Sequence, residues 1–324
     1  MAGGPKKSVL CDDNHKYIAF VHTRDKFNFD GYSPPTQTIA SVFIYDSIKG
    51  YMKAVAGSDF ELIGYVACVQ VIRKGSLYRL YVLDKVVMGR HDYMRYIDID
   101  IGEHGIYAVG EWHSTHTYTN PMQSDQCFVM LDDDTLVVCG GYDRSSRGPI
   151  SSCIAVDVNT GVVSKFPNMN NPREYHAAVH YKGTVVVIGG KGEKKESGPF
   201  QGVVCEQYDT VSKKWVEIGT PPMDSQSPCA VVVNGNIYLL RLANGRIGIY
   251  DGTTWTVLEI TPVPARPAYI MGWVSLNDNI IRCWKVGWEK EITGLEILDL
   301  TTFKVDKFTR CKMSSQHLDA FVSF

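Results

Sequence analysis

The sequence has 324 residues, of which 44% are hydrophobic and 21% are charged, and its formal net charge is −2. A chain of this length can bury a large core, and its small net charge creates no overall field that would draw it to nucleic acid or a membrane surface. The nine cysteines include no Cys-x-x-Cys pair and mostly lie in apolar runs. We therefore expect reduced, buried thiols and a cytoplasmic location. Met1 is followed by Gly3, Pro5 and Lys6 and not by a long apolar segment, so neither a signal peptide nor a membrane span is expected.

In chain order, the N-terminal part predicts an incomplete sheet. Three runs there are rich in apolar, β-branched and aromatic residues, at 17–22, 39–45 and 51–55. At the other end of the chain, residues 318–324 form a lone strand-like run. An isolated terminal strand is an aggregation hazard unless it is paired, so we expect this run to complete the N-terminal sheet.

The stretch from Arg173 to Trp215 is the most regular part of the sequence. It contains four short apolar runs separated by turn residues, such as Lys182-Gly183, and none of its windows has a helical period of 3.6. This pattern predicts a meander of four antiparallel strands. Residues 185–188 are apolar without alternation, so both faces of their strand should be covered. The sheet must therefore pack against similar sheets.

Copies of one turn signal recur along the whole chain. An apolar or tyrosine residue followed by aspartate occurs at Tyr45-Asp46, Ile99-Asp100, Val156-Asp157, Tyr208-Asp209, Tyr250-Asp251 and Leu298-Asp299. The gaps between these aspartates are 54, 57, 52, 42 and 48 residues. A period near 50 is typical of a propeller blade. Aspartate suits such a turn because its carboxylate can accept hydrogen bonds from backbone N–H groups two residues on.

The sequence resembles the Kelch-repeat family at specific positions. The residues that match a Kelch repeat are Arg173, His176, Gly189-Gly190, Tyr208-Asp209 and Trp215, with a second copy at Gly140-Gly141 and Val156-Asp157. As a motif the resemblance is specific from about residue 127 to residue 255. The other four repeats lack the diglycine, which leaves their boundaries less sharply defined.

The resemblance implies an all-β, six-bladed Kelch-type β-propeller with four antiparallel strands per blade, forming a single domain over residues 1–324. The C-terminal strand would join the N-terminal blade and close the ring. The expected limits are 313–324 with 8–57 for the composite first blade, then 63–112, 117–166, 168–218, 225–260 and 265–308.

The resemblance also implies where a partner binds. In Kelch propellers the loops from strand 4 to the next strand 1, and from strand 2 to strand 3, project from one face around the central channel. The candidate contact residues on these loops are Arg24, Arg90, Tyr142, Arg144, Arg147, Arg173, Tyr175, Arg241, Arg266, Trp288 and Arg310. Guanidinium groups bind carboxylates in a bidentate manner, so these arginines favour an acidic protein segment.

Two other interpretations of these arginines remain open. Arg173 and Arg266 stand beside the start of a repeat, where an arginine often pairs with an acid or carbonyl group of a neighbouring blade. Arg24, Arg144 and Arg147 lie in looser loops, where simple solvation is a sufficient explanation.

A weak metal-like pattern occurs at Glu111, His113 and His116. Two histidines three apart on a loop can ligate zinc or iron, but the pattern arises readily by chance and no further ligand is identifiable. Iron-dependent specifier proteins of plants share the Kelch propeller, yet their Glu-x-x-x-Asp-x-x-x-His pattern is absent. We therefore expect no metal and no cofactor, and we interpret His176 and His317 as structural residues.

Together these observations predict a non-catalytic, scaffold-like protein-interaction module. Its partner would be a protein, not nucleic acid or membrane, and the propeller would be monomeric. The alternative is a small-molecule enzyme or metal-dependent specifier protein that uses the mouth of the channel. Converging ionisable groups at the mouth would favour the alternative, whereas a broad surface with arginine and aromatic side chains would favour protein binding.

Overall fold

The computed structural model describes residues 16–26, 37–86, 92–117, 123–192, 203–221, 228–241, 246–259, 268–276, 278–286, 291–309, 313–314 and 317–323. In this part of the chain the regular structure consists of β-strands, and neighbouring strands within each sheet are antiparallel. The predicted all-β class is therefore confirmed. No helix among these residues is long and apolar enough to cross a membrane.

The described strands form seven sheets, and six of them contain a path of four neighbouring strands. Five of these paths follow the order of the chain. They are β5 (Tyr65–Lys74), β6 (Leu77–Lys85), β7 (Asp92–Gly102) and β8 (Gly105–Thr117); β10 (Cys127–Met130), β11 (Thr135–Cys139), β14 (Cys153–Asp157) and β15 (Val163–Phe166); β16 (Ala177–Tyr181), β17 (Thr184–Ile188), β18 (Glu206–Asp209) and β19 (Lys214–Glu217); β20 (Cys229–Val233), β21 (Asn236–Arg241), β22 (Arg246–Tyr250) and β23 (Trp255–Glu259); and β24 (Ala268–Leu276), β25 (Asn279–Val286), β26 (Glu291–Asp299) and β27 (Lys304–Thr309).

The remaining path, which we call the first sheet, brings the two ends of the described chain together, and the five paths above are the second to sixth sheets in chain order. Its strands, in order, are β29 (His317–Ser323), β1 (Tyr17–Lys26), β2 (Gln37–Asp46) and β3 (Tyr51–Ala54). The pairing of β29 with β1 runs from Ser323 opposite Ile18 to His317 opposite Thr23. Two short strands, β4 (Phe60–Leu62) and β28 (Met313–Ser314), pair with β2 and β26. The predicted C-terminal strand is therefore present, and its partner is the N-terminal strand.

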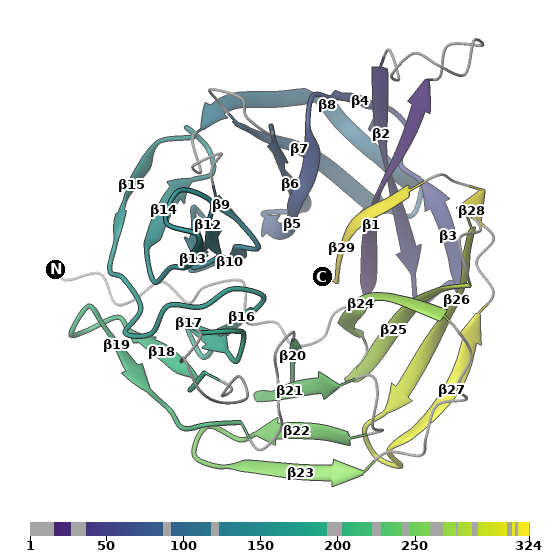
Figure 1. Ribbon diagram of the computed structural model, residues 1–324. Coiled ribbons are helices and arrows are strands. Elements are labelled where there is room, and N and C mark those ends of the chain that lie inside the picture. Colours follow the sequence, from purple (N-terminus) through teal and green to yellow (C-terminus); the bar gives the residue numbers. More distant parts are fainter. Residues whose placement is uncertain are drawn as a thin grey trace, which may run out of the picture.

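The sheets are arranged around a common centre. Figure 1 shows the innermost strand of each path, β29, β5, β10, β16, β20 or β24, nearest to this centre. Each innermost strand contacts the innermost strands of the two sheets beside it. The last strand of each path, such as β8 or β19, lies at the rim. The arrangement is consistent with a β-propeller.

The hydrophobic core lies between neighbouring sheets. In β17, the side chains of Val185 and Val187 pack in a cluster with residues of β10–β15, whereas Val186 and Ile188 pack in a second cluster with residues of β20–β22. All four side chains are 0% exposed, which confirms that both faces of this strand are covered. Full burial of each contributes roughly 1.5–3 kcal/mol. The sheets are thus held together mainly by apolar side chains, which along β17 point in turn to the preceding sheet and to the following sheet.

The turn aspartates fix the connection between the third and fourth strands of a sheet. Asp157 illustrates their action, because its Oδ1 accepts from the backbone N–H groups of Asn159 at 3.0 Å and Thr160 at 2.8 Å. The same contacts with residues two or three positions ahead are made by Asp46, Asp209, Asp251 and Asp299. Asp100 differs, since it accepts from the Tyr107 hydroxyl at 2.7 Å.

The limit between the second and third sheets differs from the expectation. We expected the second blade to end near residue 112 and the third to begin near residue 117, but β8 continues to Thr117 and β10 begins only at Cys127. The pairing of β7 with β8 shifts between Tyr96 and Asp98. Extra residues of β8, including Gly110 at φ 80°, are accommodated there, so the strand runs further than its hydrophobic pattern indicated.

Candidate functional site

We call the surface formed by residues 123–126, 140–152, 170–176 and 189–192 the loop face. Hydrogen bonds join its segments: Tyr142 pairs with Ser124, the Gly141 N–H donates to the Arg173 carbonyl at 2.8 Å, and Glu174 and Lys191 form a backbone bridge. Four connections therefore meet on one surface, namely β8 to β10, β11 to β14, β15 to β16 and β17 to β18.

A small hairpin carries Arg144 and Arg147. Its strands are β12 (Tyr142–Asp143) and β13 (Gly148–Pro149), and β12 also pairs with β9 (Gln123–Ser124). The Asp143 carboxylate accepts from the backbone N–H groups of Ser145 and Ser146, and the first of these bonds is the main cause of its lowered pKa. Arg144 and Arg147 are exposed at the tip. The hairpin thus presents two guanidinium groups on an ordered turn.

Arg173 is not part of this exposed surface, which corrects its assignment as a contact residue. Its side chain is 0% exposed. The guanidinium forms an ion pair with Glu206 and donates to the Gly189 carbonyl at 3.0 Å. The guanidinium is therefore paired inside the protein, but with an acid and a carbonyl of the sheet that Arg173 itself precedes and not with those of a neighbouring blade, as the sequence had left open. A guanidinium with these buried partners cannot contact a partner protein.

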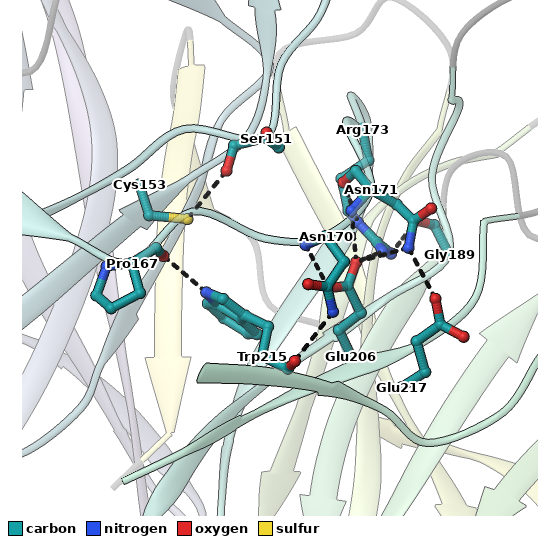
Figure 2. Close-up of polar contacts among 10 residues, drawn as sticks. All are labelled: Ser151, Cys153, Pro167, Asn170, Asn171, Arg173, Gly189, Glu206, Trp215 and Glu217. Carbon is teal, nitrogen blue, oxygen red and sulfur yellow. Dashed lines mark hydrogen bonds and ion pairs between the residues drawn. The ribbon is translucent and has the colours of Figure 1, made fainter. Parts of the chain in front are cut away.

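Glu206, which the sequence did not single out, organises the loop that leads into β16. Its carboxylate accepts from the backbone N–H groups of Asn170 at 2.7 Å and Asn171 at 3.1 Å, as well as from Arg173. Figure 2 shows these contacts converging on the glutamate. The Asn170 side chain also donates to the Trp215 carbonyl at 3.0 Å, and Trp215 Nε1 donates to the Pro167 carbonyl at 2.7 Å. The loop is therefore fixed at several points immediately before Tyr175.

In the second sheet, a buried carboxylate likewise fixes the loop that leads into the innermost strand. Asp84 is 0% exposed and accepts from the backbone N–H groups of Ile63 at 3.1 Å and Gly64 at 2.8 Å, and from Arg95 Nη2 at 3.0 Å. The next residue, Lys85, donates to Gln126 Oε1 at 2.5 Å, and burial lowers the pKa of its ammonium. The second and third sheets are thus joined by a polar contact next to the loop face.

Tyr175 is the most exposed aromatic side chain among the described candidates. It is 42% exposed and has a φ of 52°, which is uncommon for a residue other than glycine. Lys191 Nζ lies 4.7 Å from the centroid of its ring. The charge of the Asp125 carboxylate is the main cause of the raised pKa of Tyr175. Asp125 and Lys191 were not identified from the sequence, because neither belongs to a recognisable motif.

His176 is buried and neutral, in line with its interpretation as a structural residue. Burial and, less strongly, the charge of Arg173 lower its pKa to about 3. The ring fills space that only glycine leaves free: a Cβ added at Gly140 would come within 2.6 Å of the His176 ring, and one at Gly190 within 2.8 Å of its Cβ. The diglycines of two neighbouring sheets thus make room for this histidine.

The metal-like pattern does not assemble. His113 stacks on Tyr96 with centroids 4.5 Å apart, whereas His116 contacts Tyr93 at 4.9 Å. Positions three apart on a strand face opposite sides, so the two imidazoles point away from each other. Within the described residues no three histidine, cysteine, aspartate or glutamate side chains are arranged to hold a metal. Glu111 lies on the same strand and does not change this result.

Six candidates can be placed only in part or not at all. Arg90, Arg266, Trp288 and Arg310 lie outside the described residues. For Arg24 and Arg241 only the backbone is described. Arg24 is opposite Ile39 in the pairing of β1 with β2, and Arg241 ends β21 opposite Arg246. Arg24 thus belongs to a strand and not to a loop, because the β1–β2 hairpin is longer than its apolar runs indicated.

Comparisons with known proteins agree with the repeat pattern. No family model matches the chain. An F-box/kelch-repeat protein of Arabidopsis thaliana is 26% identical over 149 residues, covering 42% of this chain and 35% of that protein. The chain resembles Kelch-repeat proteins. Protein tag-53 of Caenorhabditis elegans is 25% identical over 151 residues, covering 45% of this chain but 10% of that protein. The matches thus span about a third and a tenth of the two relatives.

The similarity to one solved structure supports the fold and nothing beyond it. The structure of YjhT superposes with a TM-score of 0.55 over 80% of this chain and 87% of its own, at 12% sequence identity. The Kelch-like residues of the fourth sheet have clear roles in this fold. Tyr208 and Trp215 pack with centroids 5.6 Å apart, and Phe166 of the preceding sheet lies 4.5 Å from Tyr208. Tyr208 thus packs against a residue of its own sheet and against one of the preceding sheet.

Proposed function

We propose that this chain is a non-catalytic protein-interaction module whose partner binds on the loop face. The observation that carries the proposal is the exposure of Arg144, Arg147 and Tyr175 on loops anchored by buried polar contacts. Rigid loops with exposed arginine and tyrosine side chains suit protein recognition, because little conformational entropy is lost on binding. The likeness to a Kelch-repeat protein supports the same conclusion.

We further propose that the module is a single six-bladed propeller closed by β29. Six sheets with four-stranded paths, contacts between successive innermost strands, and the pairing of β29 with β1 support this architecture. In such a ring the first blade is composite, with one strand from the C-terminal part of the chain and three from the N-terminal part. The cytoplasmic location, the scaffold role and the monomeric state stay predictions.

The partner segment that we propose carries an acidic residue that faces the Arg144–Arg147 hairpin. Both guanidinium groups are exposed, and Asp143, the nearest acid along the chain, has its carboxylate engaged by Ser145 and Ser146. The arginines are therefore available for bidentate contacts with a carboxylate. Such exposed charge pairs are screened over roughly 10 Å at 0.1 M salt, so binding should weaken as the salt concentration rises.

Partner capture with paired variants tests the proposal. Arg144→Ala with Arg147→Ala should reduce capture of the partner and its salt dependence, while the free energy of unfolding changes by less than about 0.5 kcal/mol because both residues are exposed. Lysine at these positions should restore capture only in part. Arg73→Ala, near the β5–β6 turn on the opposite side of the second sheet, is a control that removes an exposed arginine elsewhere. Equal capture by wild type and the arginine double variant would contradict the acidic contact.

No observation among the described residues favours the enzyme or specifier alternative. That function needs ionisable groups that converge on a substrate or metal. Glu111, His113 and His116 do not converge, and His176 is enclosed between two glycine pairs. We therefore prefer protein binding.

A further inference from the structure

The loop face already holds a cation of its own chain on an aromatic ring. Lys191 Nζ lies 4.7 Å from the centroid of Tyr175. Two backbone hydrogen bonds, of 2.8 and 2.9 Å, fix Lys191 against Glu174, which directly precedes the tyrosine. Tyr175 is nevertheless 42% exposed. Because the face of an aromatic ring attracts ammonium and guanidinium groups, this position is suited to a positive charge.

Two carboxylates act electrostatically on the same position. Asp125 affects the pKa of Tyr175 more than any other group does, and it also raises the pKa of Glu174. Ser124 Oγ donates to Asp125 Oδ2 at 2.8 Å and so helps to orient the carboxylate. Of the ion pairs among described residues, none involves Asp125 or Glu174 within 4.0 Å. One lysine thus lies on the ring beside these two acids, and the other exposed cations of the loop face, Arg144 and Arg147, are at the tip of the neighbouring hairpin.

The two key residues occupy equivalent places in neighbouring sheets. Asp125 lies two residues before β10, and Tyr175 lies two residues before β16. Their φ angles are 55° and 52°, in the left-handed region. The same backbone conformation at the same repeat position sets both side chains at the entrance to an innermost strand. The loop network of Glu206 and the hairpin pairing of Ser124 hold the two positions in place.

We propose that Tyr175, Asp125 and Glu174 form a cation-accepting site for a lysine or arginine side chain of a partner protein. The inference rests on the proposed function and specifies the chemistry of the partner. Lys191 occupies the ring in the free protein and moves aside when the partner binds, which is easy because an exposed cation–π contact is weak. The partner segment then carries a basic residue at Tyr175 and an acidic residue at the Arg144–Arg147 hairpin.

Short peptides test the site on the full chain. The probes are acetylated, amidated Gly-Ser-Arg-Ser-Gly and the same peptide with glutamate or alanine in place of arginine. Their binding is followed by NMR through the Tyr175 ring and Lys191 amide resonances at low salt. We expect saturable shifts with the arginine peptide, and shifts with the glutamate and alanine peptides that do not saturate over the same concentration range. Equal behaviour of the three peptides would overturn the proposal.

Single substitutions separate the contributions of the site. Asp125→Asn should weaken binding of the arginine peptide by about two- to fivefold, as expected for an exposed ion pair. Tyr175→Leu should weaken it by about two- to fivefold through loss of the cation–π contact. Lys191→Ala should have the opposite effect and strengthen binding by about two- to fivefold, because it removes the competing cation. Unchanged or weaker binding by Lys191→Ala would contradict the displacement.

A second tyrosine–aspartate pair provides the matched control. Tyr107 is 41% exposed and donates to Asp100 at 2.7 Å, far from the loop face at the β7–β8 turn. Tyr107→Leu and Asp100→Asn should leave peptide binding unchanged. The outcome also separates this inference from the proposed function. If the arginine peptide does not bind but partner capture still depends on Arg144 and Arg147, only the cation site is wrong. If capture depends on no residue of the loop face, the proposed function is wrong.

Discussion

Arg173 shows how much the role of a residue depends on a distant partner. Its sequence position beside the repeat start allowed either an exposed contact residue or a buried ion pair. The acid that makes it a buried ion pair is Glu206, which follows 33 residues later, in β18, whereas Arg173 lies in the loop before β16. No local pattern links the two residues, so the sequence could not reveal which arginines of the loop face are available to a partner.

The buried pair predicts an asymmetric effect on stability. Arg173→Leu should lower the free energy of unfolding by about 3–5 kcal/mol, because Glu206 would keep a buried charge without its cation. Changing both residues, Arg173→Leu with Glu206→Gln, should cost less than the single change. Urea unfolding of the three proteins measures the difference. A double variant that is less stable than Arg173→Leu would contradict this account.

His176 predicts a pH dependence of stability. Its pKa is lowered to about 3 in the folded protein, whereas an unfolded histidine has a pKa of about 6.5. Below pH 6.5 the unfolded state therefore binds a proton that the folded state does not, and stability falls with the pH by at most about 1.4 kcal/mol per unit. Between pH 7 and pH 5, wild type should lose about 2 kcal/mol more than His176→Leu. Urea unfolding at both pH values measures this loss, and equal losses in the two proteins would count against it.

At the scale of the elements, local patterns were sufficient for the main strands and insufficient for the small ones. The uniform apolar run at 185–188 predicted a strand covered on both faces, and the turn aspartates predicted their own hydrogen bonds. The two-residue strands β9, β12 and β13 have no such pattern, because they form only where the β8–β10 and β11–β14 connections meet. Asp125 was equally hidden, because a left-handed φ at a residue other than glycine leaves no signal in a single sequence, whereas Tyr175 was among the expected contact residues although its backbone conformation was not foreseen.

The diglycine of the fourth sheet predicts a specific cost of adding a side chain. Gly189 and Gly190 have φ values of 60° and 93°. A Cβ at Gly190 would lie 2.7 Å from the Glu174 carbonyl, so Gly190→Ala should lower the free energy of unfolding by about 1–3 kcal/mol or more. Gly183→Ala is the control, because its φ is 81° but no atom lies within 4 Å of the added Cβ. Denaturant unfolding should show a larger loss for Gly190→Ala than for Gly183→Ala; equal losses would mean that the contact with Glu174 is unimportant.

At the scale of the whole molecule, β29 predicts that the C-terminal strand is essential to the propeller. Deleting residues 317–324 should expose the edge of β1 and separate the first sheet from its neighbour. We expect aggregation in size-exclusion chromatography or a large drop in melting temperature. His317→Ala alone, which keeps the strand, is the control. A truncated protein that stays soluble with unchanged melting would show that β29 does not fasten the ring.

The pairing of β29 with β1 also has a consequence for biosynthesis. β1 emerges from the ribosome early, but its partner strand starts at His317, 291 residues after Lys26. At roughly 5–20 residues per second, the edge of β1 waits about 15–60 s for that partner. During this time the edge has unpaired backbone groups and buried-type side chains such as Phe20 and Val21. We therefore expect chaperones to hold the nascent chain until β29 has been synthesised.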